Sequence, residues 1–203
     1  KIQSRVDLLL KEDTITALAQ SGAETVWVGA ESGSQKILDA MDKGTTIEEI
    51  NTATKLLKKN NIRVAFFLQF GYPGETKEDI NKTVEMVLNL MPDEIGISVS
   101  YPLPGTKFFE NVKDQLKTKS NWADSDELAL MFRNTFPPAY YKRLHRYVHK
   151  VYRKRVGLKS ILNIVRNPLS VSAKNLRSAI LILYYIPASI LDSFLLKKLE
   201  TAE

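Results

Sequence analysis

The sequence of 203 residues contains no cysteine. Disulfides are therefore excluded, and so is a thiolate-held metal ion or an iron–sulfur cluster bound by this chain alone. The first residues, KIQSRVD, also lack an initiator methionine and the apolar stretch of a secretory signal peptide. We expect an internal piece of a longer cytoplasmic protein.

Acidic residues are scarce in the second half of the chain, and none occurs between Glu127 and Asp192. Residues 111–203 carry 17 lysines and arginines against 7 acidic residues, whereas residues 1–110 carry 12 against 16. Two regions with different partners are indicated. We place the boundary after residue 112, where a polar and weakly periodic segment begins, so that the predicted domains are 1–112 and 113–203.

Strands and helices alternate in the first region, and no hairpin signal joins one strand to the next. Parallel strands with helices packed against the sheet are therefore predicted, which is an α/β fold. Four strands form an open sheet or a partial (β/α) barrel rather than a closed one. The expected strands are 2–10, 25–30, 62–70 and 94–100, and the expected helices are 14–20, 46–60, 76–90 and one that begins at 106.

Glycine, hydroxyl and carboxylate residues gather where three of these strands end. The segments are GAESGS (29–34), GYPGE (71–75) and SVSYPLPGT (98–106), and the first strand adds Arg5. The carboxyl ends of parallel strands meet at one edge of the sheet, where ligands bind in such folds. Glycine lets a ligand approach the backbone, and carboxylates with hydroxyls suit a ribose. Turn formation alone is the alternative explanation for any one of these loops.

Three segments resemble the second half of the radical S-adenosylmethionine (radical SAM) barrel. They are VWVGAESGSQKILDAMDKGTT, VAFFLQFGYPGET and ISVSYPLPGTKFFENV, and the branch they resemble usually carries a cobalamin-binding domain. The resemblance implies that the four strands are the third to the sixth of a six-stranded partial barrel. The cysteine loop that holds the 4Fe–4S cluster and the glycine-rich turn would then lie outside this segment.

The resemblance also implies cofactor-binding positions at the strand ends, where the parent protein would bind S-adenosylmethionine (SAM). It names no catalytic residue and no metal ligand in this segment. The residues expected to bind the cofactor are Arg5, Glu31, Ser32, Ser34, Gly71, Pro73, Gly74 and Ser98.

Simpler roles compete for three of the acidic and basic residues near these positions. Glu31 is also a carboxylate at the start of a helix, where the helix dipole favours it. Arg5 is as well placed to pair with Asp7, and Glu75 to cap backbone amides.

By resemblance, the parent protein is an enzyme that cleaves SAM at a 4Fe–4S cluster and starts a methylation or rearrangement of a small or lipid-like substrate. Cobalamin is a further candidate cofactor, and the N-terminal half of the same protein is the expected partner. The alternative is a non-catalytic half-barrel that acts as a binding or scaffold module.

The C-terminal region combines a basic amphipathic helix, expected within 140–156, with an apolar run over 178–191. That run has 14 uncharged residues, fewer than the about 18 of a membrane-spanning helix. Packing against the barrel and binding to an anionic membrane surface are both open. Nucleic acid is unlikely, since no stacking or RNA-binding motif accompanies the charge. His145 and His149 are more typical of surface groups than of metal ligands.

Overall fold

The computed structural model describes residues 1–116 and 132–201, which form two compact units, Lys1–Pro138 and Ala139–Glu203. The domain boundary after residue 112 was inferred from the change in composition, and it stays a prediction. Most of the polar segment that suggested it, 113–122, lies outside the described residues.

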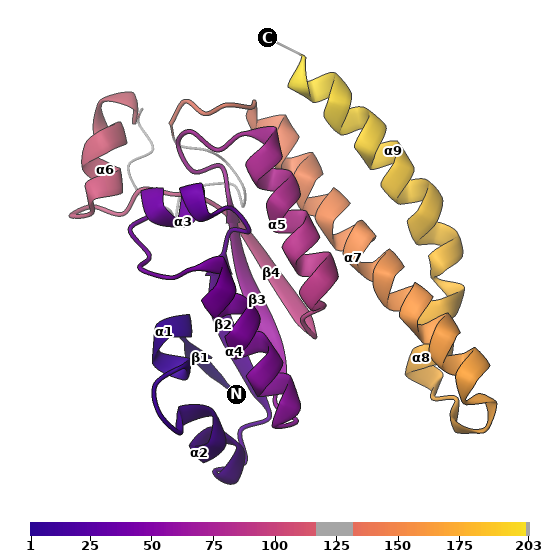
Figure 1. The fold of residues 1–203 in the computed structure, drawn as a ribbon. Coiled ribbons are helices and arrows are strands. Elements are labelled where there is room, and N and C mark those ends of the chain that lie inside the picture. The colour runs from indigo at the N-terminus through magenta and orange to yellow at the C-terminus, as the bar shows by residue number, and fades with distance from the viewer. Residues whose placement is uncertain (117–131, 202–203) are drawn as a thin grey trace. The chain divides into compact units, whose positions relative to one another are not determined.

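The first unit contains a four-stranded parallel sheet in the order β1-β2-β3-β4 (Figure 1). The predicted α/β fold with about four parallel strands, followed by a helical C-terminal region, is therefore confirmed. The strands are β1 (Ile2–Ser4), β2 (Thr25–Glu31), β3 (Arg63–Phe70) and β4 (Glu94–Val99).

The prediction of a strand over 2–10 is wrong in its length. The strand ends at Ser4, and α1 (Val6–Leu9) follows at once. Val6 and Leu9 are both buried, at 1% exposure, while Leu8 is 43% exposed. Apolar residues three positions apart share one face of a helical turn, and this spacing outweighs the β propensity of the run.

The helices expected in the first unit all form, each within a residue or two of its predicted bounds, and short helices that were not predicted occur between them. The basic helix expected within 140–156 is longer and spans Pro138–Arg166. The unpredicted α3 (Gln35–Ala40) follows β2, and the 3-10 helix η1 (Lys113–Gln115) follows α6. The predicted helices are α2 (Thr14–Gln20), α4 (Ile47–Lys59), α5 (Lys77–Leu90) and α6 (Lys107–Val112).

Two capping boxes fix the starts of α4 and α5. The Thr46 hydroxyl accepts the amide of Glu49 at 3.2 Å, and the Glu49 carboxylate accepts the amide of Thr46 at 2.7 Å. Thr76 and Asp79 make the same exchange at α5, at 3.4 and 3.0 Å. Both caps satisfy amides that have no partner inside the helix.

The two faces of the sheet have different surroundings. One face is fully buried, with Val26, Val28, Val64 and Phe66 at 0–1% exposure, and α4 and α5 lie along the sheet in Figure 1. Toward the carboxyl ends of the strands, the alternate positions point to the other face and are only half-buried; they are Trp27, Gly29, Phe67 and Gln69. The core therefore lies between the sheet and its helices, and the second face is left with room for a ligand.

The second unit is helical and comprises α7 (Pro138–Arg166), the 3-10 helix η3 (Pro168–Ser170), α8 (Ala173–Ile180) and α9 (Ile182–Glu200). Asp192 of α9 is fully buried and pairs with Arg143 and Lys150 of α7, at 3.0 and 2.7 Å. No single helix among the described residues is long and apolar enough to cross a membrane. By length and composition alone, α8 and α9 together are long and apolar enough, as a pair bent by 42°.

Candidate functional site

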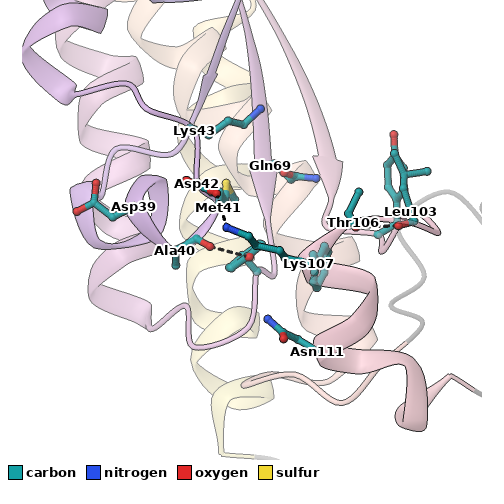
Figure 2. A pocket seen from close by; sticks show the side chains of 13 residues that line it. Asp39, Ala40, Met41, Asp42, Lys43, Gln69, Leu103, Thr106, Lys107 and Asn111 are labelled. Atoms are coloured by element: carbon teal, nitrogen blue, oxygen red, sulfur yellow. Dashed lines mark hydrogen bonds and ion pairs between the residues drawn. The ribbon is translucent and has the colours of Figure 1, made fainter.

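A cavity of about 670 Å³ lies at the carboxyl edge of the sheet, where the loops after β2, β3 and β4 meet (Figure 2). This is the edge at which parallel α/β folds bind ligands. Its walls mix acidic, basic and aromatic side chains. The residues that line it include Asp39, Asp42, Lys43, Gln69, Tyr72, Tyr101, Thr106, Lys107 and Phe108.

Polar contacts tie these three loops together around the cavity. The Tyr72 hydroxyl donates to the Ala40 carbonyl at 2.8 Å, and the Lys107 ammonium lies 3.0 Å from the Asp42 carboxylate. The Tyr72 ring also packs on Phe108, with 4.9 Å between the ring centroids. Burial raises the pKa of Tyr72, so its hydroxyl keeps its proton as a donor at neutral pH.

Glu31 lies at an irregular end of β2. The pairing with β3 shifts between Gly29 and Glu31, and Glu31 has a φ of 54°, in the left-handed region. Its carboxylate lies back over Gly29, where a Cβ atom would be 3.0 Å from Oε1. A non-glycine residue with positive φ costs energy and is common at functional sites.

The Glu31 carboxylate pairs with the Lys43 ammonium, which lines the cavity, at 2.9 Å. The Glu31 side chain is 15% exposed and that of Lys43 40% exposed. Lys43 was not predicted as a site residue. Lys43 does lie in the first of the three quoted segments, but a lysine before a glycine is common in turns and indicates no binding role. Only the fold brings Lys43 to Glu31.

Gln69 and Ser98 occupy paired positions on β3 and β4 and point to the half-buried face of the sheet. Gln69 lines the cavity, and the Ser98 hydroxyl donates weakly to the Leu68 carbonyl at 3.4 Å. Of the two, the prediction named only Ser98 as a cofactor-binding residue, and Gln69 is the better placed.

An aromatic layer lies one step back along the same face. The Trp27 and Phe67 rings stack with 4.6 Å between centroids. Gly96 opposite leaves space for them, since a Cβ there would be 3.2 Å from the Trp27 ring. These rings form an apolar surface on the sheet, next to the polar residues at the strand ends.

Ser32 and Ser34 make internal hydrogen bonds, and their predicted contact with the cofactor stays a prediction. The Ser32 and Thr83 hydroxyls lie 3.2 Å apart, and the Ser34 hydroxyl donates to Asp79 at 2.6 Å. Both serines are buried, at 0% and 2% exposure. Burial opposes the ionisation of Asp79, but hydrogen bonds from Ser34 and Thr76 outweigh it and hold the pKa of that carboxyl well below its usual range. The two serines therefore fasten the loop after β2 to α5.

The turn 71–75 is held closed by a buried carboxyl group. Glu75 accepts the Gly71 amide on Oε2 at 2.7 Å, as expected for a carboxylate that caps amides, and its side chain is fully buried. Among the described residues, its other oxygen, Oε1, has no hydrogen-bond partner. Burial raises the pKa of Glu75 to about 8, so it is largely protonated at neutral pH.

A later segment of the chain covers the outside of this turn. The Asn134 amide donates to the Gly71 carbonyl, and the Thr135 hydroxyl donates to the Glu75 carbonyl at 2.8 Å. Gly71 and Gly74 have φ of 77° and 81°, which glycine adopts without strain. Neither these glycines nor Pro73 is among the residues that line the cavity, and their predicted contact with adenine stays a prediction.

Arg5 makes the simpler of its two predicted contacts. Its guanidinium pairs with Asp7 at 2.9 and 3.3 Å, and this hydrogen bond lowers the pKa of Asp7. Arg5 is not among the residues that line the cavity. Its predicted role toward a cofactor stays a prediction.

Comparisons with known proteins match the first unit. Residues 3–87 match the family model of the radical SAM superfamily. Over 120 residues the chain is 31% identical to an uncharacterized methyltransferase of Pyrococcus horikoshii, covering 59% of this chain and 26% of that protein. Over 101 residues it is 37% identical to a tRNA-2-methylthio-N(6)-dimethylallyladenosine synthase of a Sulfurihydrogenibium species, covering 48% and 23%. The chain thus spans about a quarter of the length of these relatives.

A solved structure shares the fold. It is the radical SAM methyltransferase TsrM from Kitasatospora setae, with cobalamin and a 4Fe–4S cluster bound. The TM-score is 0.50 and the identity 24%, over 56% of this chain and 21% of TsrM. The likeness shows the fold alone. Residues 3–87 thus resemble the radical SAM superfamily in sequence, and the four parallel strands of the first unit agree with the fold of TsrM.

Proposed function

We propose that this chain supplies the SAM-binding edge of a radical SAM enzyme whose other half lies elsewhere in a longer protein. The observation that carries the proposal is the Glu31–Lys43 pair, 2.9 Å apart, of which Lys43 lines a cavity of about 670 Å³ on the carboxyl edge of the sheet, while Glu31 is not among the lining residues. The relatives that support it are named as a methyltransferase and a methylthio-group-adding synthase.

The chemistry of the edge complements SAM. The methionyl end of SAM carries an ammonium and a carboxylate group, and the edge offers Glu31 as acceptor and Lys43 as donor. Because Glu31 is only 15% exposed, charge-assisted hydrogen bonds there are weakly screened and strong. Gln69 and Ser98 add neutral groups suited to ribose hydroxyls, and the Trp27–Phe67 layer adds an apolar surface.

The residues of this chain do not fit the iron–sulfur cluster that the superfamily implies. There is no cysteine, and no group of three or more histidine, aspartate or glutamate residues in the described ranges is arranged to hold a metal ion. The cluster would be held by the rest of the parent protein. In this proposal the residues of this chain bind and orient SAM, and a cluster held by the rest of the parent protein would supply the reducing chemistry.

The finer functional assignment rests on the relatives' names. Methylation of a small or lipid-like substrate is the reaction class that we propose, with cobalamin as a candidate cofactor because TsrM binds it. A non-catalytic half-barrel is the second candidate, and the absence of cysteine favours it.

We expect Glu31→Gln and Lys43→Met each to weaken SAM binding by about tenfold or more, since each removes one charge from a partly buried pair. Isothermal titration of SAM into the full chain measures this. The matched control is Lys82→Met, which breaks a Lys–Glu pair with Glu78 at 2.9 Å on α5, none of whose residues lines the cavity. Equal affinity in the wild type, both site variants and the control would return Glu31 and Lys43 to a structural role.

The enzymatic part is tested on the parent protein. After anaerobic reconstitution with iron, sulfide and a reductant, we expect SAM to be cleaved. A cluster-loaded parent that binds SAM and leaves it intact would support the non-catalytic alternative instead.

A further inference from the structure

The outer face of α9 is apolar and exposed. Leu183, Tyr184, Ile190, Leu191 and Phe194 are 77%, 56%, 64%, 56% and 54% exposed. At 3.6 residues per turn these positions share one side of the helix. The opposite side carries Ile182, Ser189, Asp192 and Leu196, which are buried. Single exposed apolar residues are ordinary, but a continuous face of this size marks a binding surface.

Exposed apolar side chains also occur on α8 and at the end of α7. Leu162 and Val165 of α7 are 54% and 73% exposed, and Leu176 and Ile180 of α8 are 50% and 58% exposed. These elements are held together, because a Cβ on Gly157 of α7 would lie 2.7 Å from the Ser178 carbonyl oxygen of α8. The second unit thus presents apolar side chains from three helices.

The charge beside this surface is entirely positive over a long stretch. No acidic residue occurs from 128 to 191. The next one, Asp192, is fully buried and paired with Arg143 and Lys150, so it presents no negative charge to a partner. Exposed cations of α7, α8 and α9 stand next to the apolar residues; they are Lys159, Arg166, Lys174, Arg177, Lys197 and Lys198.

A groove of about 330 Å³ between α7 and α9 is lined by both apolar and basic side chains. Ile190 and Phe194 of the exposed apolar face line it, together with Tyr147. Lys154 and Lys197 line it as well. An apolar groove with ammonium groups at its walls suits an amphiphile that has a negative head group.

We propose that α8, α9 and the end of α7 bind the surface of an anionic lipid bilayer, with the apolar face of α9 in the interfacial layer and the cations on the head groups. Apolar area and basic charge on one surface are the two contributions that add up in such binding. A second copy of this chain would bring like charges together, which disfavours self-association. The protein would then act at the membrane surface on the cytoplasmic side.

Co-sedimentation of the full chain with vesicles tests this proposal. We expect binding to phosphatidylcholine vesicles that contain phosphatidylglycerol, at least about tenfold weaker binding to pure phosphatidylcholine, and a marked loss of binding as salt rises. The result is independent of SAM binding, so it can fail while the proposed function holds.

Two pairs of variants separate the contributions. Lys174→Glu with Arg177→Glu is expected to weaken binding at least about tenfold, and its control is Lys55→Glu with Lys59→Glu on exposed positions of α4. Leu183→Ser is expected to weaken binding severalfold. Its control is Leu56→Ser, at an exposed apolar position of α4.

Three outcomes would overturn the proposal. One is equal binding to neutral and anionic vesicles. Another is binding that survives about 1 M salt, which would indicate insertion of the helices rather than surface attachment. The third is no vesicle binding at all, whether the chain stays monomeric or associates through the apolar face.

Discussion

Replacing Gly33 by alanine is expected to destabilise the first unit by about 3 kcal/mol. A Cβ atom at this position would lie 2.3 Å from the carbonyl oxygen of Lys82 and 2.7 Å from the Cα atom of Thr83. Both are backbone atoms of α5, so no rotation of a side chain removes the clash. The loop after β2 and α5 would have to move apart.

That movement would also break the contacts that hold the loop in place. The Gly33 amide donates to the Thr83 hydroxyl at 2.9 Å, and the Ser34 hydroxyl donates to Asp79 at 2.6 Å. Because Glu31 lies two residues earlier, the Glu31–Lys43 pair is expected to shift as well, so weaker SAM binding should accompany the loss of stability.

Urea unfolding of the wild type, Gly33→Ala and Gly22→Ala measures the effect. Gly22 has a φ of 78° and nothing within 4 Å of an added Cβ, so the control carries only the backbone strain of about 1 kcal/mol. Equal midpoints for the two variants would show that the clash is relieved by a movement that costs little.

The contribution of Glu75 to the free energy of unfolding is expected to fall as pH rises from about 5 to about 8. The ordinary pKa of Glu75, 4.5, is raised to about 8, first by burial and further by the nearby Asp79 carboxylate, against the Gly71 amide and Lys36, which lower it. Between these two pKa values the unfolded chain has released the proton and the folded chain still holds it. Stability from this group is therefore complete below about pH 4.5 and is lost as pH rises toward 8, by roughly 4 kcal/mol at most.

Glu75→Gln isolates this contribution, since glutamine keeps the shape and cannot ionise. We expect the variant to accept the Gly71 amide as the wild type does, to lack the decline, and to be the more stable protein at pH 8. Chemical unfolding at pH 5, 6.5 and 8 gives the comparison.

Two other groups do not disturb this comparison. Burial lowers the pKa of His149 to about 4, so His149 contributes stability that is lost as pH falls below about 6.5, in both proteins alike. The pKa of Asp79 is lowered, so its contribution to the free energy of unfolding changes only at still lower pH. Parallel pH profiles for wild type and Glu75→Gln would show that Glu75 is ionised in the folded protein.

The sequence by itself determined the architecture of the first unit. Periodicity and the Thr46 and Thr76 caps placed helices and strands almost where they form, because both signals act within a few residues. The absence of cysteine excluded a cluster bound by this chain. The long predicted strand at the N-terminus failed because the burial of Val6 and Leu9 is a tertiary property.

Only the tertiary structure decided what the polar residues at the strand ends do. Ser32 and Ser34 look like ligands in the sequence, yet their hydroxyls meet α5, whose contacting residues come about 50 positions later. Lys43 comes to the cavity edge and to Glu31 by the folding of separate loops, whereas Gln69 could be placed there from its strand parity with Gly71. Glu75 has its raised pKa because the fold removes water from it. The outcomes for the two serines, Lys43 and Glu75 depend on contacts between distant parts of the chain, and local sequence patterns carry no record of them.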